Sequence, residues 1–307
     1  MEIYLLVRKT FFMAMFSLFF ICNAVQAADV AITMDDFKFV DSPLMTGKEQ
    51  DERILTSLER NQVEAALFVI GGVLEQPLAR ERQALWDRAN HIIANHTYTH
   101  TSYGDSSFEE FSGEVVRTEE VLAQYRNYHK LFRFPALKEG ETREKRDQMR
   151  SFLKAHGYRQ GYVTIDASDW YIDRRLVDRL KQDSKANLKG YRDYYLQHIW
   201  DRAQFYDGLS KKVLGRSVKH TLLIHHNQLN ALFLNDLIAM FGSKGWRVIS
   251  AREAFQDPVF QMEPDIVPAV ESILWALAKE TGKFDHLLRY QGEDAAYEKP
   301  MMDKLGL

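Results

Sequence analysis

Residues 30–36 of the chain read VAITMDD, a short apolar run that ends in two adjacent aspartates, Asp35 and Asp36. An apolar run of this length is typical of a buried strand of a parallel sheet. Similar short runs recur along the chain, and longer amphipathic stretches separate them. The run at 30–34 is therefore predicted to be the first strand of an α/β fold.

The repeated rhythm predicts the whole architecture. We expect strands at 30–34, 65–70, 91–94, 131–134, 161–165, 220–225 and 246–249. We expect helices at 51–62, 78–89, 108–125, 142–156, 191–206 and 229–241. Strands that alternate with helices run parallel and are joined by crossover connections. About seven such units predict one distorted (β/α) barrel, a single domain with a C-terminal helical extension.

The first 27 residues have the pattern of a signal peptide. Arg8 and Lys9 precede an apolar run at 11–24, which is short for a membrane span, and small residues close the segment at Ala27. We expect cleavage there, giving a periplasmic or secreted protein with no stable membrane anchor; an uncleaved N-terminal anchor is the alternative. Cys22, the one cysteine, lies in this segment, so the mature chain has no disulfide.

The C-terminal part changes in character. We expect a catalytic domain over 28–256 and a tail over 257–307. Pro258, Pro264 and Pro268 interrupt the start of this tail. A single helix is predicted at 267–279, docked on the domain and followed by a loose polar end.

Composition excludes some classes of partner. Of 307 residues, 46% are hydrophobic and 27% are charged, which predicts a packed globular core. The formal net charge of -3 argues against nucleic acid or an anionic membrane as a partner. Nothing in the composition indicates an oligomeric state.

Polar residues follow several of the predicted strands at the point where each strand ends. These residues are Asp35, Asp36, His96, His100, Arg133, Pro135, Asp166, Asp169 and His225. In (β/α) barrels the catalytic groups gather at the C-terminal ends of the strands. We therefore expect these side chains to converge on one pocket.

His96 and His100 are candidate metal ligands. Two histidines four residues apart on a helical turn point the same way. With a carboxylate from Asp36 they form a set of two histidines and one aspartate, which suits Zn²⁺ and leaves a position open for water or substrate. Iron(II) or cobalt would accept the same ligands. The alternative is a structural or surface pair of histidines.

The adjacent aspartates can hold different roles. Neighbouring residues that leave a strand point in different directions, so one carboxylate can bind the metal while the other accepts a proton from water. Arg133 can hold that base ionised through a charge-assisted hydrogen bond. A turn or helix cap for the aspartates, and a surface position for Arg133, are the alternatives.

His225 is a candidate general acid. A histidine at a pocket rim can protonate a departing amine, whereas a lone histidine is often a satisfied core residue. A buried Asp169 could orient such a histidine, and Trp170 could wall the pocket against an acetyl methyl group. The alternative for 166–170 is a polar loop followed by a core tryptophan.

In order and spacing these clusters resemble the motifs of the polysaccharide deacetylases, the NodB-homology group of carbohydrate esterase family 4. Thr33–Phe37 resembles T-F-D-D-G, His96–His100 matches H-[ST]-x-x-H, Arg133–Pro135 matches the start of R-x-P-x-G, Asp166–Trp170 matches D-x-x-D-W, and Leu222–His225 matches L-x-x-H. The resemblance extends from about residue 30 to 250, nearly the whole mature chain.

The resemblance implies a metal-dependent hydrolase that acts on carbon–nitrogen bonds and N-deacetylates a GlcNAc-containing polysaccharide. It implies Asp35 as general base, Arg133 as its brace, and His225 as general acid tuned by Asp169. It implies Asp36, His96 and His100 as ligands of a divalent metal, for which we expect Zn²⁺. We expect Trp170 and Pro135 to contact the carbohydrate.

The chain departs from the family pattern at several positions. Phe37 replaces glycine and Ala136-Leu137 replaces an aromatic-glycine pair, changes expected at the groove rim and the loop beside the oxyanion. The tyrosines within 191–206 have the spacing of a core face, with a sugar groove as the alternative. Two other functions stay open: an O-acetyl esterase acting on a xylan-type substrate with the same metal centre, and a non-catalytic glycan-binding module.

Overall fold

The computed structural model describes residues 28–289 and 294–307. The predicted signal peptide at 1–27, with Cys22, lies outside the described residues, and so its cleavage and the location of the protein stay predictions. Within the described part of the chain, no helix combines the length and the apolar character needed to cross a membrane.

The centre of the molecule is a seven-stranded sheet in which every pair of strands is parallel. Its order is β5-β4-β3-β2-β1-β6, and β7 pairs with the beginning of β1. The strands are β1 (Asp29–Asp35), β2 (Ala66–Val69), β3 (Ile92–Asn95), β4 (Tyr128–Phe132), β5 (Arg159–Gln160), β6 (Lys219–His225) and β7 (Arg247–Val248).

The register of β1 and β6 matters for the site. The two strands pair along their whole length, from Asp29 opposite Lys219 to Asp35 opposite His225. Because parallel strands end at the same edge, this register places two of the predicted catalytic residues side by side. Sequence periodicity cannot specify such a pairing, because it depends on which strands become neighbours.

The segment 159–165 contacts both edge strands of the sheet, β4 and β6, and so closes the sheet into a barrel. Its first residues, β5, pair with β4, and Ile165 a few residues later bridges to Leu222 of β6. The Leu223 N–H donates to the Ile165 carbonyl at 3.0 Å, and the Ile165 N–H donates to the Thr221 carbonyl at 3.0 Å. The predicted distorted (β/α) barrel is confirmed, although the expected strand at 161–165 is only this irregular link.

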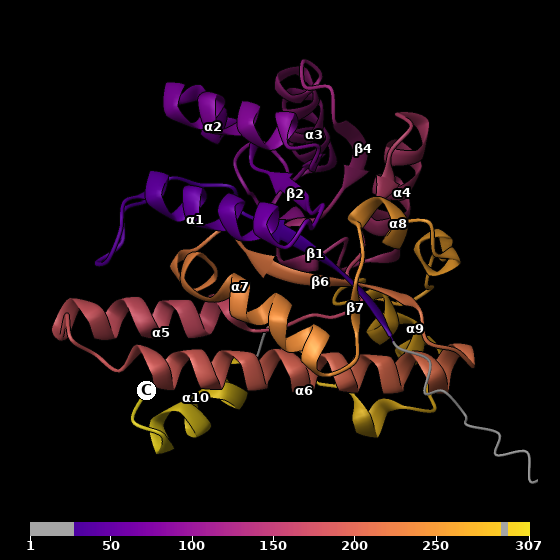
Figure 1. Cartoon of the computed structure of the whole chain (residues 1–307). Coiled ribbons are helices and arrows are strands. Elements are labelled where there is room, and N and C mark those ends of the chain that lie inside the picture. Colours follow the sequence, from indigo (N-terminus) through magenta and orange to yellow (C-terminus); the bar gives the residue numbers. More distant parts are fainter. Residues whose placement is uncertain (1–27, 290–293) are drawn as a thin grey trace, which may run out of the picture.

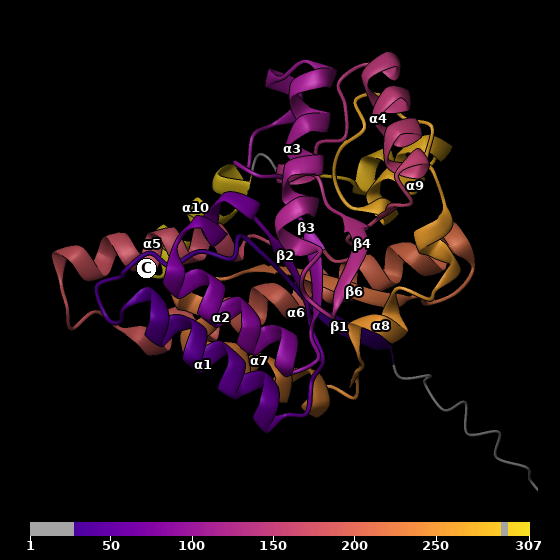
Figure 2. The same ribbon diagram turned by 90° about the horizontal axis from the view of Figure 1, so that it is seen from above.

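Helices surround the sheet (Figures 1 and 2). The long ones are α1 (Gly47–Arg60), α2 (Pro77–Arg88), α3 (Phe108–Leu122), α4 (Arg143–Ala155), α5 (Asp169–Gln182), α6 (Leu188–Leu214) and α7 (Gln228–Ser243). The short α8 (Ala251–Ala254) precedes α9 (Ile273–Thr281) and α10 (Asp294–Lys304). Helix α1 begins four residues before the predicted start, because Thr46 and Glu49 form a capping box that nucleates the helix earlier.

Helix α5 was not predicted. Asp169, for which a polar loop was the alternative, is the first residue of this helix, which runs beside α6 along one side of the sheet (Figure 1). Helix α6 is longer than predicted, and its Tyr191, Tyr195 and Tyr206 are fully buried. These tyrosines therefore belong to the core, and the sugar-groove alternative for them is wrong.

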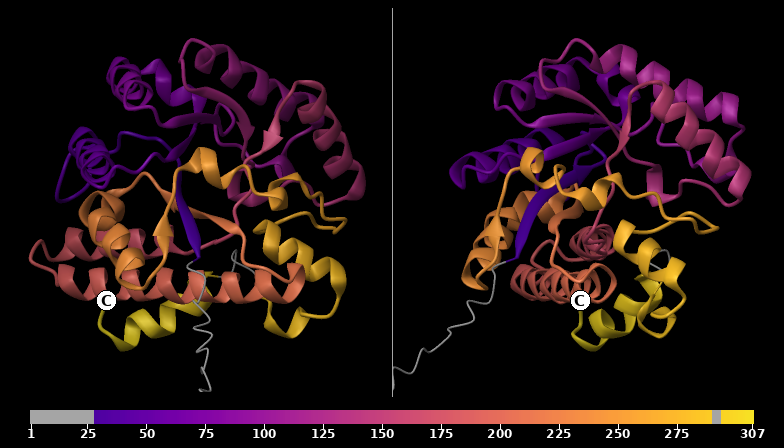
Figure 3. Two further views of the ribbon diagram at one scale, coloured as in Figure 1. Left: turned by 45° about the vertical axis from the view of Figure 1, so that its right-hand side comes forward. Right: turned by 90° about the vertical axis from the view of Figure 1, so that its right-hand side faces the viewer.

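The tail is more ordered than predicted. The expected helix at 267–279 begins only at Ile273, because the Ser272 side chain caps that position by accepting the Trp275 N–H. The expected loose polar end is wrong, since α10 packs beside α5 and α6 (Figure 3) and Met302 is fully buried. The hydrophobic core is continuous from the barrel into the tail, and the division at residue 257 stays a prediction.

Candidate active site

A cleft of about 900 Å³ opens at the C-terminal ends of the strands. Seven residues singled out from the sequence line it: Asp35, Asp36, His96, His100, Asp166, Trp170 and His225. The predicted convergence of the strand-end residues is therefore confirmed for these positions. The core-tryptophan alternative for Trp170 is wrong, because this half-buried side chain lies on the cleft wall.

Asp36, His96 and His100 present one ligand atom each to a common point. Asp36 Oδ1 lies 3.1 Å from His100 Nε2 and 3.7 Å from His96 Nε2, and the three ligand atoms all lie within 4.8 Å of one another. Asp36 Oδ1 is buried and has no hydrogen bond of acceptable geometry among the described residues. Two imidazole nitrogens and one carboxylate oxygen that face one another in this way fit a divalent metal ion such as zinc.

The protonation of these groups suits a metal site. His96 Nδ1–H donates a hydrogen bond to the Arg133 carbonyl at 2.8 Å, so the unprotonated Nε2 faces Asp36. Burial lowers the pKa of His96, which favours the neutral ring that a metal requires. Burial raises the pKa of Asp36, but the contact with His100 and the nearby histidine charges outweigh it, so the pKa lies well below its ordinary value.

The two histidines do not lie on a helical turn, and that prediction is wrong. Residues 96–100 form a loop in which Thr97 and His100 adopt positive φ values of 66° and 60°. The Asn95 side chain accepts the Thr97 N–H at 3.0 Å, and Glu114 accepts the N–H groups of the two following residues. These side-chain acceptors replace the hydrogen bonds that a helix would supply, and they hold the ligands in place.

Backbone strain concentrates around the cleft. Of the eight non-glycine residues with positive φ in the described chain, six lie at this site: Asp36, Thr97, His100, Ala136, Leu137 and Glu271. Such conformations cost on the order of 1–3 kcal/mol each and persist only where the surrounding structure enforces them. The strain indicates that the rest of the fold positions these residues at the expense of local stability.

Asp35 and Arg133 form a buried ion pair at the floor of the cleft. Arg133 Nη1 donates to Asp35 Oδ1 at 2.5 Å, Nη2 donates to Thr33 Oγ1 at 3.1 Å, and Nε donates to the Gly161 carbonyl at 2.8 Å. The surface position for Arg133 is thus wrong. Asp35 Oδ2, the other carboxylate oxygen, lies 3.7 Å from His96 Nε2, next to the candidate metal site.

His225 and Asp169 form the second pair. His225 Nδ1 donates to Asp169 Oδ1 at 2.7 Å, and the His225 N–H donates to Asp169 Oδ2 at 2.8 Å. Burial lowers the pKa of His225, but the charge of Asp169 and its hydrogen bond raise it to about 9. Because Nδ1 is engaged, Nε2 is the ring atom left to act on a bound substrate. His225 lines the cleft, so the core-histidine alternative is wrong.

Phe37 and Pro135, both expected at the groove, do not line the cleft. Phe37 is fully buried, and its ring packs against Phe39 and His226 at centroid distances of 4.9 and 5.2 Å, so this replacement does not alter the groove rim as expected. Pro135 is buried and does not line the cleft, whereas the next residues, Ala136 and Leu137, do. The predicted contact of Pro135 with substrate therefore lacks support from the geometry.

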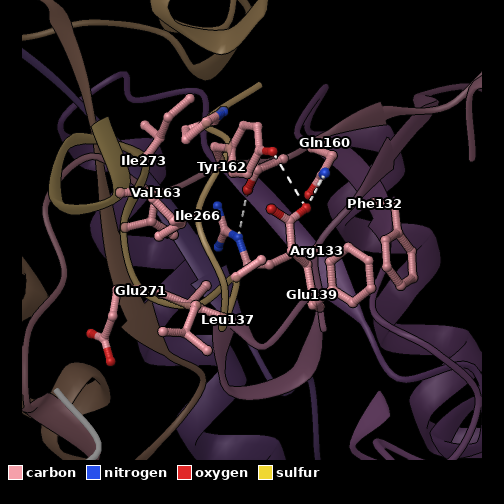
Figure 4. A pocket seen from close by; sticks show the side chains of 16 residues that line it. Phe132, Arg133, Leu137, Glu139, Gln160, Tyr162, Val163, Ile266, Glu271 and Ile273 are labelled. Atoms are coloured by element: carbon pink, nitrogen blue, oxygen red, sulfur yellow. Dashed lines mark hydrogen bonds between the residues drawn. The ribbon is translucent and has the colours of Figure 1, made fainter. Parts of the chain in front are cut away.

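The wall beside Leu137 comes from the tail, which sequence reasoning did not connect with the site. The Glu139 N–H donates to the Ala269 carbonyl at 2.9 Å, and the Ala269 N–H donates to the Gly140 carbonyl at 2.7 Å. Figure 4 shows the Glu139 carboxylate, which accepts hydrogen bonds from Gln160 and Tyr162. Glu271 lies on the other side of Leu137 in this view. Pro268, Val270 and Glu271 thereby reach the cleft, and no motif signalled them.

Comparison with known proteins agrees with this geometry. Residues 23–161, which carry the first strands and the candidate ligands His96 and His100, match the polysaccharide deacetylase family. This part of the chain is therefore similar to a polysaccharide deacetylase domain. The peptidoglycan-N-acetylglucosamine deacetylase of Bacillus cereus is 31% identical over 102 residues, which are 33% of each protein. The chain thus matches about a third of the length of this curated relative.

Solved structures of polysaccharide deacetylases share the fold. A family 4 pseudoenzyme from Bacillus anthracis has a TM-score of 0.52 and 18% identity, over 75% of this chain and 66% of that one. The chitin deacetylase of Colletotrichum lindemuthianum has a TM-score of 0.52 and 21% identity, over 75% and 88%. At this identity the likeness establishes the fold, and it extends beyond the residues that the family match covers.

Proposed function

We propose that the chain is a metal-dependent hydrolase that N-deacetylates a GlcNAc-containing glycan. The observation that carries the proposal is the arrangement of three units in one cleft: a candidate metal triad, a braced carboxylate at Asp35 and an Asp169–His225 pair. A nucleophile activator, a base and an acid around one pocket are what amide hydrolysis needs.

Asp36, His96 and His100 would hold the metal, for which zinc is the proposed identity. When bound there, a divalent ion supplies Lewis-acid polarisation of the acetyl carbonyl and acidifies an attacking water. Lys38 Nζ lies 3.2 Å from Asp36 Oδ2, the outer oxygen, so Oδ1 is the oxygen left for the ion. The site can therefore bind through one carboxylate oxygen and two ring nitrogens, with positions open for water and substrate.

Asp35 is the proposed general base. Arg133 engages Oδ1, so Oδ2 is free to accept a proton from the water that attacks the acetyl carbon. The guanidinium also fixes the carboxylate through its own hydrogen bonds to Thr33 and Gly161. A base that is already oriented in this way loses little further freedom when the substrate binds.

His225 is the proposed general acid. A pKa of about 9 keeps the ring protonated at neutral pH, and Nε2 can deliver that proton to the nitrogen that leaves when the tetrahedral intermediate collapses. Asp169 holds the ring from the opposite side. The β1–β6 register places His225 opposite Asp35, so acid and base act on one substrate from adjacent strands.

The Bacillus cereus relative, named a peptidoglycan-N-acetylglucosamine deacetylase, supports an N-acetylated glycan as the substrate class. Trp170, on the cleft wall, is proposed to contact the acetyl methyl group or the sugar ring. The predicted signal peptide supports action in the periplasm or outside the cell, where such glycans occur.

The pseudoenzyme among the structural neighbours keeps a second function under consideration, a glycan-binding module that does not catalyse. In this chain the base, the acid and the ligand triad are all present, which favours an enzyme. Hydrolysis of O-acetyl esters would use the same residues. An alkoxide leaves more readily than an unprotonated nitrogen, which would leave as an amide anion, so ester hydrolysis depends less on the proton from His225.

The test is acetate release from chitooligosaccharides and from acetylated xylan by the protein without its predicted signal peptide. Release is measured after metal removal and again after zinc is restored. We expect zinc-dependent release from the amide substrate, lost in Asp35→Asn and retained in Asp178→Asn, which changes an exposed aspartate. We expect His225→Ala to reduce amide hydrolysis by about 100-fold or more and ester hydrolysis much less. Release from the ester alone would replace the proposal with an esterase, and tight zinc binding without any release would favour a binding module.

A further inference from the structure

Asn230, near the start of α7, contacts the Asp169–His225 pair from behind. Its Nδ2 lies 2.8 Å from Asp169 Oδ2, 2.9 Å from the His225 carbonyl and 3.1 Å from Asn227 Oδ1. Its Oδ1 accepts a hydrogen bond from the Tyr195 hydroxyl of α6 at 2.5 Å. Asn230 and Tyr195 are fully buried, and neither lines the cleft.

The surroundings determine which way the Asn230 amide points. Three acceptors surround Nδ2, and an amide turned over would direct its oxygen at all three, including a carboxylate. The NH₂ group must therefore face Asp169. Among the described residues, the Tyr195 hydroxyl donates to the Asn230 oxygen alone, so it completes the hydrogen bonds of the amide.

This arrangement controls the position of Asp169. Its Oδ2 accepts from the His225 N–H, from Asn227 Nδ2 at 3.2 Å and from Asn230 Nδ2, while Oδ1 is left for the His225 ring. The three hydrogen-bonded side chains come from three helices: Asp169 from α5, Asn230 from α7 and Tyr195 from α6. A carboxylate anchored on one oxygen cannot rotate freely, and the other oxygen stays directed at the ring.

We propose that Asn230 is a positioning residue of the deacetylase: its amide, oriented by Tyr195, holds Asp169 so that His225 keeps the geometry of a general acid. The proposal deepens the proposed function and rests on it for any effect on rate. Asn230 does not touch the substrate, and no family motif in the sequence includes it. The role requires the N–H donor of the Asn230 amide and does not depend on the volume of the side chain.

Two substitutions of Asn230 separate donor from volume. Asn230→Leu removes the donor and keeps about the same bulk, while Asn230→Asp keeps the shape and the acceptor for Tyr195 but turns an acceptor toward Asp169. We expect both to lower kcat by about tenfold or more and to leave KM within about twofold, because the loss falls on the acid step. We expect Tyr195→Phe to act in the same direction by about twofold to threefold.

The decisive readout is the pKa of His225, followed by nuclear magnetic resonance of its ring protons in the metal-free full-length protein. We expect this pKa to fall toward its ordinary value in Asn230→Leu, and less in Tyr195→Phe. Asn230→Asp is compared by kcat alone, because its added carboxyl group is itself a charge close to His225. Asn127→Leu is the matched control: it removes a buried amide that contacts Asp87 and Arg252, away from the cleft, and should change neither kcat nor the His225 pKa.

A fall in kcat together with the His225 pKa supports the proposal. An unchanged His225 pKa in folded Asn230→Leu, or kcat equal to that of the unmodified protein in either Asn230 variant, would overturn it. If neither Asn230 variant folds, Tyr195→Phe decides by the same pKa. If the unmodified protein releases no acetate, the proposed function fails, and the His225 titration still decides this inference because it needs no turnover.

Discussion

Arg133 and Asp35 form an ion pair with Nη1 and Oδ1 2.5 Å apart, in which both side chains are at least 95% buried. The two residues are 98 positions apart in the chain and meet because β1 and β4 end at the same edge of the sheet. A buried pair of this kind contributes little when intact, but losing one partner leaves an uncompensated charge away from water.

Replacing Arg133 by methionine should therefore destabilise the protein and inactivate it. We expect the free energy of unfolding to fall by about 3–5 kcal/mol, because Asp35 would remain buried without its partner. Urea unfolding of the metal-free protein measures this. Arg143→Met is the control, because Arg143 pairs with Asp265 on the surface and its removal should change little. An equal effect of both substitutions would show that the burial of Arg133 is not the cause.

Zinc should stabilise the protein through the triad. A ligand that binds only the native state raises the free energy of unfolding, so adding zinc to metal-free protein should raise Tm. Asp36→Ala should abolish this rise and weaken zinc binding by more than about 100-fold in competition with a chelator. His156→Ala, which removes an exposed histidine, should behave like the unmodified protein. A rise in Tm that persists in Asp36→Ala would place the zinc elsewhere.

The Asp169–His225 pair should make stability depend on pH above neutrality. The pKa of His225 in the folded protein is about 9, above its ordinary value of 6.5. The native state therefore binds this proton more tightly than the unfolded chain does, and the resulting stability is complete below about pH 6.5 and lost as pH rises through 9. The loss should be at most about 3 kcal/mol in metal-free protein. Denaturant unfolding from pH 6 to 10 measures it, and His225→Gln should flatten that part of the curve.

The two adjacent methionines of α10 test whether the tail is part of the core. Met302 is fully buried, whereas Met301 is 52% exposed. We expect Met302→Ala to lower the free energy of unfolding by about 2–4 kcal/mol and Met301→Ala to change it by less than about 0.5 kcal/mol. Thermal or urea unfolding compares them directly. Equal and small effects would mean that α10 does not remain docked in solution.

The α/β architecture and most of the site could be inferred from the residues alone. Short apolar runs identified β1, β2, β3 and β6 to within a residue or two, because a strand buried on both faces needs an unbroken apolar segment. The polar residues that follow those runs could be placed at one edge, because parallel strands share an edge. That reasoning places Asp36, His96, His100 and His225 at the site from the sequence.

Local chemistry that competes with periodicity was harder to read. Helix α5 begins at Asp169 without a side-chain cap, so its start carried no signal, and β4 lies earlier than expected because Tyr128 and His129 are only partly buried. The loop carrying His96 and His100 is shaped by side-chain acceptors from Asn95 and Glu114, one of them distant in the chain. Spacing of four residues suggested a helical turn because it contains no information about those acceptors.

Which distant groups meet depends on how the strands and helices pack in the folded chain. The pairing of β1 with β6 along their full length places Asp35 opposite His225, and the packing of α5, α6 and α7 brings Asn230 and Tyr195 to Asp169. The tail reaches the cleft wall through two backbone hydrogen bonds between Ala269 and residues 139–140. Each depends on contacts between segments far apart in the chain, and a local pattern records the chemistry of a residue but not the neighbours that folding gives it.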